Sequence, residues 1–387
     1  MDTITLNHPY LLGNEVDSLS HALHCIAGNN KDQIKSFEDA CCEASDRSFA
    51  VAAGTPSVAL EAAMLALDLK RGDEVLISAL APPRLARAVI RTGATPVFID
   101  VHPRHGAMQA EAAEMAITEH TRAIALTAPY GNPTGSVEMS KVSQKYELPV
   151  IEDAVESFGA RVGKDHAGRF GVLAVIGFDQ DSPIPAAGGA AVITHDDALA
   201  ASCREILDQG RSPHPGVGDH AGLMDTRWQY TRRGLDGGLD SLRASLAVDM
   251  LSRMPETLER RMEIADIYVR RLCGNADLVV PTPPNDAQPS WPAFPVRLDE
   301  RFVEEDRDEI IAAILRHDIG VHAGWSLAPM FSEVRTPHTD PDTWPIAQRL
   351  ASRTLRLPCH PKLSDRDIDL ICQTLELMLT RSVFTRE

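Results

Sequence analysis

Residues 73–101 read DEVLISALAPPRLARAVIRTGATPVFIDV, and this stretch decides the fold class. Two short apolar runs, 73–78 and 96–101, have the composition of buried strands. Between them, residues 85–92 are typical of a helix, and Gly72 supplies a turn just before the first run. Strand, helix and strand in this order predict a βαβ unit whose two strands run parallel.

The same alternation continues outward from this stretch, from residue 49 to about residue 194. Strand-like runs at 123–127, 149–153 and 190–194 are separated by segments typical of helices. We therefore expect an α/β fold, in which a mostly parallel sheet carries helices on both faces.

The pattern changes after a loop rich in Gly, Pro and His at residues 210–222. Ser364 is expected to cap the last helix, with Asp367 three residues on in a capping-box arrangement. We predict a large domain, 1–245, which includes an N-terminal arm, and a smaller C-terminal α+β domain, 246–387. The elements expected after the loop are a helix at 239–272, a turn-rich connection at 281–289, a strand at 293–298 and helices at 306–317 and 364–379.

Composition excludes several classes of function. A formal net charge of −17 argues against nucleic acid and anionic membranes as partners. The seven cysteines are scattered and form no C-x-x-C pair, so neither a disulfide framework nor a zinc site is indicated, which suits the cytoplasm. The N-terminus lacks the pattern of a signal peptide, and no apolar run approaches the roughly 18 residues of a membrane span.

Seven short motifs occur along the chain in a fixed order. They are KSFE at 35–38, GT at 54–55, GDEV at 72–75, GATPVFIDV at 93–101, IEDA at 151–154 with FGA at 158–160, GG at 188–189, and LP at 357–358. In this order and near this spacing, they resemble the motifs of the DegT-type sugar aminotransferases over about residues 10–380.

The resemblance implies a PLP-transferase fold of type I with a seven-stranded sheet. It also implies a homodimer whose active sites lie at the interface, and chemistry on pyridoxal phosphate. That chemistry needs a lysine for the imine, a carboxylate that keeps the pyridine nitrogen protonated, and a flat side chain stacked on the ring. Small polar groups must also hold the phosphate, in a cradle at a helix N-terminus.

Asp153, in IEDA, matches the family aspartate that holds the pyridine nitrogen, although a helix N-cap is the simpler interpretation of this residue. The lysine is missing, because residues 177–189 read GFDQDSPIPAAGG. Counting back from the glycine pair places the lysine position at Gln180 or Asp181. Counting forward from the preceding strand places it at Ile184, since the loop is shortened. We therefore predict that no imine forms with a lysine.

The phosphate cradle of the family is also altered. Thr55 is retained and Ser57 lies in the helix start, but Asp179 replaces a serine and Glu156 replaces a His or Gln. Asp236 replaces the asparagine that the family supplies from the neighbouring subunit. At about 4 Å, each carboxylate would repel a phosphate charge by roughly 4 kcal/mol, more than the ~1 kcal/mol of a hydrogen bond. We therefore expect phosphate binding to be lost through charge.

Two more residues change the expected cleft. Pro82 stands where the family has the aromatic ring that stacks on the cofactor. Arg84 follows at the start of the same helix. Its side chain is either a solvated surface charge or a guanidinium that neutralises Asp153 or Asp179.

A group of carboxylates matches the type of ligand that Mg²⁺ or Ca²⁺ prefers. Their convergence would follow only from the resemblance, and we predict no metal site. The residues concerned are Asp153, Glu156, Asp179, Asp181 and Asp236.

Three functions follow. The first is a degenerate family member in amino-sugar or natural-product biosynthesis, with no pyridoxal phosphate or pyridoxamine phosphate bound. The second is a cofactor-free acid/base enzyme that uses Asp153, Asp179 or Asp236. The third is an aminotransferase or dehydratase that uses pyridoxamine or pyridoxal phosphate without the lysine. A small molecule, a sugar or biosynthetic intermediate, is the expected ligand, and the sequence names neither the substrate nor the pathway.

Overall fold

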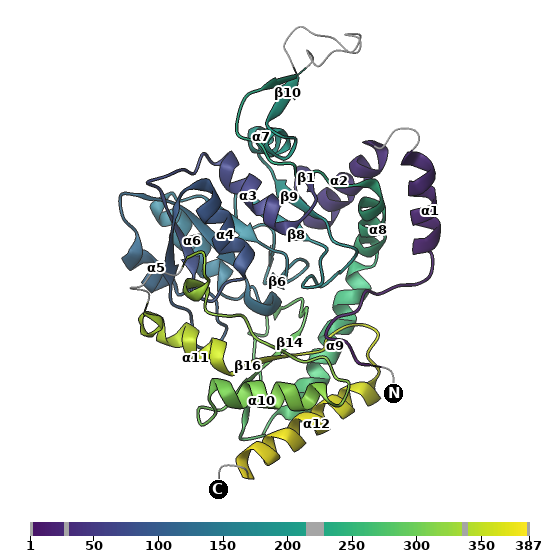
Figure 1. The fold of residues 1–387 in the computed structure, drawn as a ribbon, viewed down its shortest axis with the longest axis vertical. Helices are drawn as coiled ribbons and strands as arrows, with labels where there is room; N and C mark the ends of the chain where they lie inside the picture. The colour runs from purple at the N-terminus through teal and green to yellow at the C-terminus, as the bar shows by residue number, and fades with distance from the viewer. Residues whose placement is uncertain (1–2, 27–30, 214–227, 335–339, 385–387) are drawn as a thin grey trace.

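The computed structural model describes residues 3–26, 31–213, 228–334 and 340–384, and a seven-stranded sheet forms its centre (Figure 1). The strands are β1 (Phe49–Ala53), β2 (Glu74–Ser78), β3 (Thr95–Ile99), β4 (Thr121–Thr127), β5 (Val150–Asp153), β8 (Leu173–Gly177) and β9 (Ala190–Thr194). Their order in the sheet is β1-β9-β8-β5-β4-β2-β3. Strand β9 runs antiparallel to both neighbours, and the other pairings are parallel. The expected mostly parallel sheet is confirmed.

Helices cover both faces of this sheet. In β2, Val75 and Ile77 point into one hydrophobic cluster and Leu76 into another, because successive side chains of a strand alternate between faces. Burial on both faces explains why the strands are continuous apolar runs in the sequence. The first face carries α3 (Pro56–Ala66), α4 (Pro83–Thr92) and α7 (Asp197–Leu207), and the second α2 (Lys31–Ser45), α5 (Ala110–Ala116), α6 (Ser136–Tyr146) and α8 (Ser241–Ser252).

Helix α4 connects β2 to β3 and begins two residues before the expected position. Pro83 occupies its first turn, where a missing N–H costs nothing because that N–H has no partner in the helix. The helix ends at Gly93, whose φ of 95° favours glycine. The early start matters for function, since it brings Arg84 into the first turn, at the carboxyl edge of the sheet.

The small domain has its own antiparallel sheet and core. The expected helix 239–272 is in fact two helices that meet at Arg253. The expected boundary at residue 245 falls inside α8, which packs against α1 (Glu15–Ile26) and α2 in the large domain. The small-domain elements are α9 (Met254–Leu272), β12 (Leu278–Val279), β14 (Phe294–Leu298), α10 (Glu304–Leu315), β15 (His322–Ala323), β16 (Thr354–Leu357) and α12 (Asp365–Phe384), in the sheet order β12-β14-β16-β15.

Two smaller features complete the fold. The expected cap of the last helix is present, with the Asp367 N–H donating to Ser364 Oγ at 3.2 Å. A hairpin of β10 (Arg211–Pro213) and β11 (Trp228–Tyr230) projects from the large domain at the top of Figure 1. The rest of the expected 210–222 loop lies outside the described residues. Within the described part of the chain, no helix has the length and apolar character needed to cross a bilayer.

Candidate functional site

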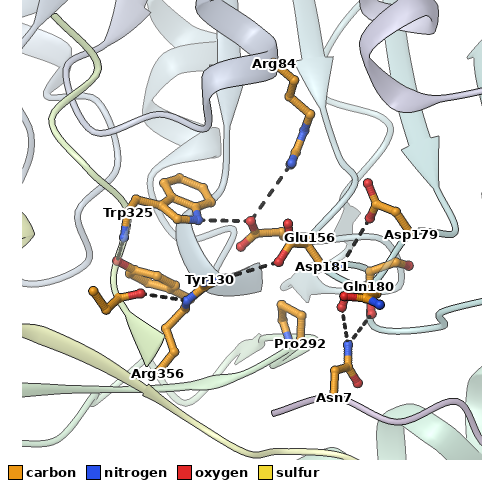
Figure 2. A network of polar contacts seen from close by, with 12 residues as sticks. Asn7, Arg84, Tyr130, Glu156, Asp179, Gln180, Asp181, Pro292, Trp325 and Arg356 are labelled. Carbon is orange, nitrogen blue, oxygen red and sulfur yellow. Dashed lines mark hydrogen bonds and ion pairs between the residues drawn. The ribbon is translucent and has the colours of Figure 1, made fainter. Parts of the chain in front are cut away.

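Four charged side chains gather at the carboxyl edge of the central sheet, where α/β folds commonly bind their ligands. Asp153 is the last residue of β5, and Glu156 lies in the turn that follows. Arg84 reaches the edge from the first turn of α4, and Asp179 comes two residues after β8. Figure 2 shows Arg84 pointing toward Glu156, with Asp179 beside them.

Arg84 is not a solvated surface charge. Its Nε donates to Oδ2 of Asp153 at 2.7 Å, and the two side chains are 11% and 0% exposed. Burial disfavours the charged guanidinium, but Asp153, Glu156 and Asp179 outweigh that effect and raise the pKa of Arg84. Of the two interpretations of this arginine, the structure shows the ion pair with Asp153.

Glu156 is the second buried carboxyl of the site. Its Oε1 accepts a hydrogen bond from Trp325 Nε1 at 3.0 Å and lies 3.9 Å from Arg84 Nη2. Among the residues that the structure describes, that Nη2 has no hydrogen-bond partner of its own. Burial raises the pKa of Glu156 to about 8, against the opposing charge of Arg84 and with the help of the nearby Asp181 carboxylate. A carboxyl that titrates near neutrality is suited to general acid/base work.

The loop after β8 brings Asp179 and Asp181 to the same site. The Asp181 N–H donates to Asp179 Oδ1 at 3.3 Å, and Arg356 Nη1 donates to Asp181 Oδ1 at 3.4 Å. Burial raises the pKa of Asp179, although Arg84 opposes this shift. The Asp181 side chain is 49% exposed, whereas Asp153 is fully buried, so the network runs from the core of the protein to solvent.

The N-terminal arm holds this loop in place. Asn7 Nδ2 donates to the carbonyl oxygens of Gln180 and Ser182. Ile184, the other position at which the lysine is expected, is buried in the core. The first lysine on each side of this loop along the chain is exposed: Lys164 lies between β6 (Arg161–Val162) and β7 (Asp165–His166), and Lys362 lies beside His8.

The residues aligned with the phosphate cradle are partly separated from this cluster. Thr55 Oγ1 accepts from the Val58 N–H at 3.3 Å and caps α3, and Ser57 is exposed beside it. Asp236 is exposed and forms an isolated bridge with Asp208. Pro82 is buried directly before α4.

Sequence reasoning missed a cation at this cradle. Arg243 Nη1 donates to the Gly54 carbonyl at 2.9 Å, and its Nε donates to Asp240 at 2.6 Å. Because this arginine is paired with the Asp240 carboxylate, the pair adds no net charge at the start of α3. Trp325 and Arg356 were missed as well. Arg356 directly precedes the LP motif, which was the available signal, whereas no motif marks Trp325.

The alternative of a hard-cation site is not supported. Within the ranges that the structure describes, no group of three or more His, Cys, Asp or Glu side chains is arranged to hold a metal ion. Arg84 lies among Asp153, Glu156 and Asp179 in the position that a cation would need. The convergence of carboxylates at this edge is real, but a guanidinium supplies the compensating charge.

Residues 13–376 match the sequence profile of the DegT/DnrJ/EryC1/StrS aminotransferase family. The chain belongs to this family. It is 27% identical to GDP-perosamine synthase of Escherichia coli O157:H7 over 97% of this chain and 98% of that protein. It is 26% identical to UDP-2-acetamido-2-deoxy-3-oxo-D-glucuronate aminotransferase of Pseudomonas aeruginosa, over 89% and 90% of the two chains.

Solved structures agree on the fold of this DegT-family chain. The sugar aminotransferase Spr1654 of Streptococcus pneumoniae, in its PMP form, superposes with a TM-score of 0.90 at 20% identity, over 98% of this chain and 100% of that one. PseC of Helicobacter pylori, an aminotransferase in the biosynthesis of pseudoaminic acid, gives a TM-score of 0.87 at 19% identity, over 97% and 99%.

The residues of this site do not fit the family's cofactor. The carboxylate that would receive the pyridinium N–H already accepts a hydrogen bond from Arg84, and both groups are buried. The sequence has no lysine between Lys164 and Lys362 to form an imine. Pro82, which the resemblance aligns with the family's stacking aromatic residue, is buried at the N-cap of α4. No step of a mechanism is therefore derived through pyridoxal phosphate.

Proposed function

We propose that this protein acts in amino-sugar or natural-product biosynthesis as a degenerate member of its family, without lysine-dependent transamination. The observation that carries the proposal is the buried ion pair between Arg84 Nε and Asp153 Oδ2 at 2.7 Å. The biosynthetic setting rests on family membership and on relatives whose names describe enzymes of sugar-nucleotide amination.

The physical reason is competition for one carboxylate. In a pyridoxal phosphate enzyme, this aspartate stabilises the protonated ring nitrogen, which lets the ring accept electrons. Here the guanidinium of Arg84 already neutralises Asp153. Moving Arg84 aside would leave a buried charge uncompensated, which costs about 3–5 kcal/mol in typical proteins. Contacts made by the cofactor would first have to offset this cost before they contributed to net binding.

A second candidate function is cofactor-free acid/base chemistry, which the environment of Glu156 favours. This carboxyl has a pKa of about 8, lies beside the Arg84 guanidinium, and is influenced by the charge of the half-exposed Asp181. A small molecule with an anionic or enolisable carbonyl group would meet a hydrogen-bond donor in Arg84 and a proton donor or acceptor in Glu156. The sugar or biosynthetic intermediate expected from the family is a ligand of this kind.

The proposal is tested by adding cofactor to the purified protein. We expect neither pyridoxal phosphate nor pyridoxamine phosphate to show a near-ultraviolet absorbance change or calorimetric heat at 1 mM or about that concentration. Borohydride reduction followed by mass spectrometry should find no adduct at a single lysine. Stoichiometric micromolar binding of pyridoxamine phosphate would instead make the lysine-free aminotransferase the leading function.

A gain-of-binding variant sharpens this test. Arg84→Ala with Asp179→Ser frees the Asp153 carboxylate and removes one negative charge from the site. We expect measurable affinity for pyridoxamine phosphate, improved at least tenfold over the wild type. The matched control is Arg87→Ala, on the same helix, whose side chain is 49% exposed and pairs with Glu333. If the double variant and the control bind pyridoxamine phosphate with equal affinity, the Arg84–Asp153 ion pair is not what prevents binding.

We also propose that the chain forms a homodimer, as its family membership implies. Exposed apolar side chains on the N-terminal arm and α1, and on β11 in the projecting hairpin, support an interface. They are Leu11, Leu12, Val16, Leu23, Trp228 and Tyr230. Light scattering at micromolar concentration should report twice the mass of one chain, and a monomer would contradict the proposal.

A further inference from the structure

A hollow lies between the two domains, and its lining includes neither Arg84 nor Glu156. The space between its walls, including the part open to solvent, is about 550 Å³, and Tyr130, Leu80 and Asn132 line it from the large domain. From the small domain come β12, β14 and the start of β16, with Val280 and Trp291 beside them. Most of this lining is apolar, as in sites that hold an organic molecule.

A second hollow adjoins the first and is smaller, about 490 Å³ with its solvent-open part included; the two share Val279, Arg297 and Leu350. Arginines gather at this junction. Arg297 projects from β14, while Arg349 and Arg353 come from α11 (Pro345–Arg353), and all three line the smaller hollow. Arg104, in the loop after β3, lines the larger one.

The charges at this junction are not balanced. Among the residues that the structure describes, none of these four guanidiniums forms an ion pair with a carboxylate. Arg297 Nη1 donates to the Pro103 carbonyl at 2.8 Å, and Arg353 Nε donates to the Arg349 carbonyl at 3.2 Å. The carboxylates that line the smaller hollow are Asp299 and Glu300. On a chain with a net charge of −17, clustering four arginines against two acids leaves a local excess of positive charge.

The arginines also affect one another. Burial, with the neighbouring charges of Arg353 and Arg349, lowers the pKa of Arg297, while Glu300 opposes that shift. His105, which lines the larger hollow, is held neutral because burial and the adjacent His102 lower its pKa to about 4. Its Nδ1 accepts from the Ala107 N–H at 3.3 Å, so the ring proton lies on Nε2 and is available to a ligand.

We propose that this junction, the interdomain arginine site, binds a small organic phosphate. The phosphate would lie against Arg297, Arg349 and Arg353, and the carbon skeleton would lie in the apolar hollow beside Val279. Arginine suits a phosphate because its planar fork donates two parallel hydrogen bonds and stays charged when partly buried. A ligand here contacts both domains, so its binding stabilises one arrangement of the two.

Calorimetry at low ionic strength tests the site, with phenyl phosphate and inorganic phosphate as the two probes. We expect phenyl phosphate to bind about tenfold more tightly, because its ring buries apolar surface that inorganic phosphate lacks. Arg297→Gln with Arg353→Gln should weaken phenyl phosphate at least tenfold. Arg349→Gln keeps the test valid if that double variant fails to fold, because Arg349 is exposed, and it should weaken binding about threefold.

The control is Arg316→Gln, the same loss of charge at the end of α10, where the arginine is exposed and lines neither hollow. This change should alter the dissociation constant by less than about twofold. The proposal fails if phenyl phosphate does not bind the wild type at 10 mM or about that level. It also fails if the control weakens binding as much as Arg349→Gln, or if both probes bind equally. A change of oligomeric state without any effect on phosphate binding would assign the arginines to a protein interface instead.

Discussion

Two arginines of this protein, Arg84 and Arg261, have side chains largely shielded from solvent but do different things. Arg84 faces carboxylates at the carboxyl edge of the central sheet, and its pKa is raised. Arg261, on α9, is 0% exposed and donates to the carbonyl oxygens of Pro183, Trp291, Pro292 and Cys359. Burial without a carboxylate lowers its pKa to about 10.

The partners explain the difference. Arg261 also donates to Asn7 Oδ1, so it joins the N-terminal arm, the loop after β8 and the small domain. It satisfies backbone acceptors that would otherwise be buried without a partner. Arg84 balances charge instead and leaves its Nη2 without a hydrogen bond. A buried arginine whose partners are backbone carbonyls stabilises structure, whereas one with an unsatisfied donor among carboxylates is a candidate for chemistry or binding.

The largest expected effect comes from removing Arg261. Arg261→Met should lower the free energy of unfolding by about 3–5 kcal/mol, because several buried carbonyl groups lose their donor together. Denaturant titration measures the change. Arg260→Met is the matched control on the same helix, since Arg260 is 29% exposed and pairs with Glu263 and Asp365. We expect it to cost about 1 kcal/mol or less. If the two variants lose a similar free energy of unfolding, Arg261 does not have this structural role.

Removing Arg84 should cost less and be reversible by a second change. Arg84→Met leaves the Asp153 carboxylate buried and uncompensated, and we expect a loss of about 2–4 kcal/mol. Adding Asp153→Asn to this variant should restore at least half of that loss, because the uncompensated charge is gone. The double-mutant cycle then gives a coupling energy above about 1 kcal/mol. Additive losses would mean that the two side chains do not stabilise each other.

The sequence predicted most of the scaffold but only part of the site. The strands followed from composition because burial on both faces makes them continuous apolar runs, as in β2 and β5. Asp153 could be singled out because it matches a family motif, and Arg84 because it follows Pro82, which departs from one. Their contact could be offered only as an alternative, since it joins residues 69 positions apart.

The remaining residues of the site had no local signature. Trp325 reaches Glu156 from 169 residues away, and its role depends on how the small domain packs on the large one. Arg243 contacts Gly54 across 189 residues, so alignment of the cradle residues alone could not place this arginine there. The helix break at Arg253 was also missed, because apolar residues continue through both α8 and α9.

Glu156 should give a smaller effect that depends on pH. Its pKa is 4.5 in the unfolded chain and about 8 in the folded one, so the folded protein holds the proton more tightly. The resulting stabilisation is complete below pH 4.5 and is lost as the pH rises to about 8. Glu156→Gln does not ionise and can keep the bond from Trp325, so it should exceed the wild type by about 1–2 kcal/mol at pH 9 and show little advantage at pH 5. A pH-independent difference would contradict this assignment.

The smallest expected effect on stability is at the solvent end of the network. Asp181 is 49% exposed and lies 3.4 Å from Arg356, so Asp181→Asn should change the free energy of unfolding by less than about 0.5 kcal/mol. The same change removes a negative charge that raises the pKa of Glu156. In proteins with Asp181, stability falls relative to the Glu156→Gln variant as the pH rises past the pKa of Glu156. When both proteins also carry Asp181→Asn, this fall should occur at a lower pH. Asp249→Asn, on α8 and away from the cleft, is the control and should leave that pH unchanged. If Asp181→Asn leaves the pH of this fall unchanged, Arg356 and solvent screen Asp181 from Glu156. The group of interacting charges then ends at Arg84.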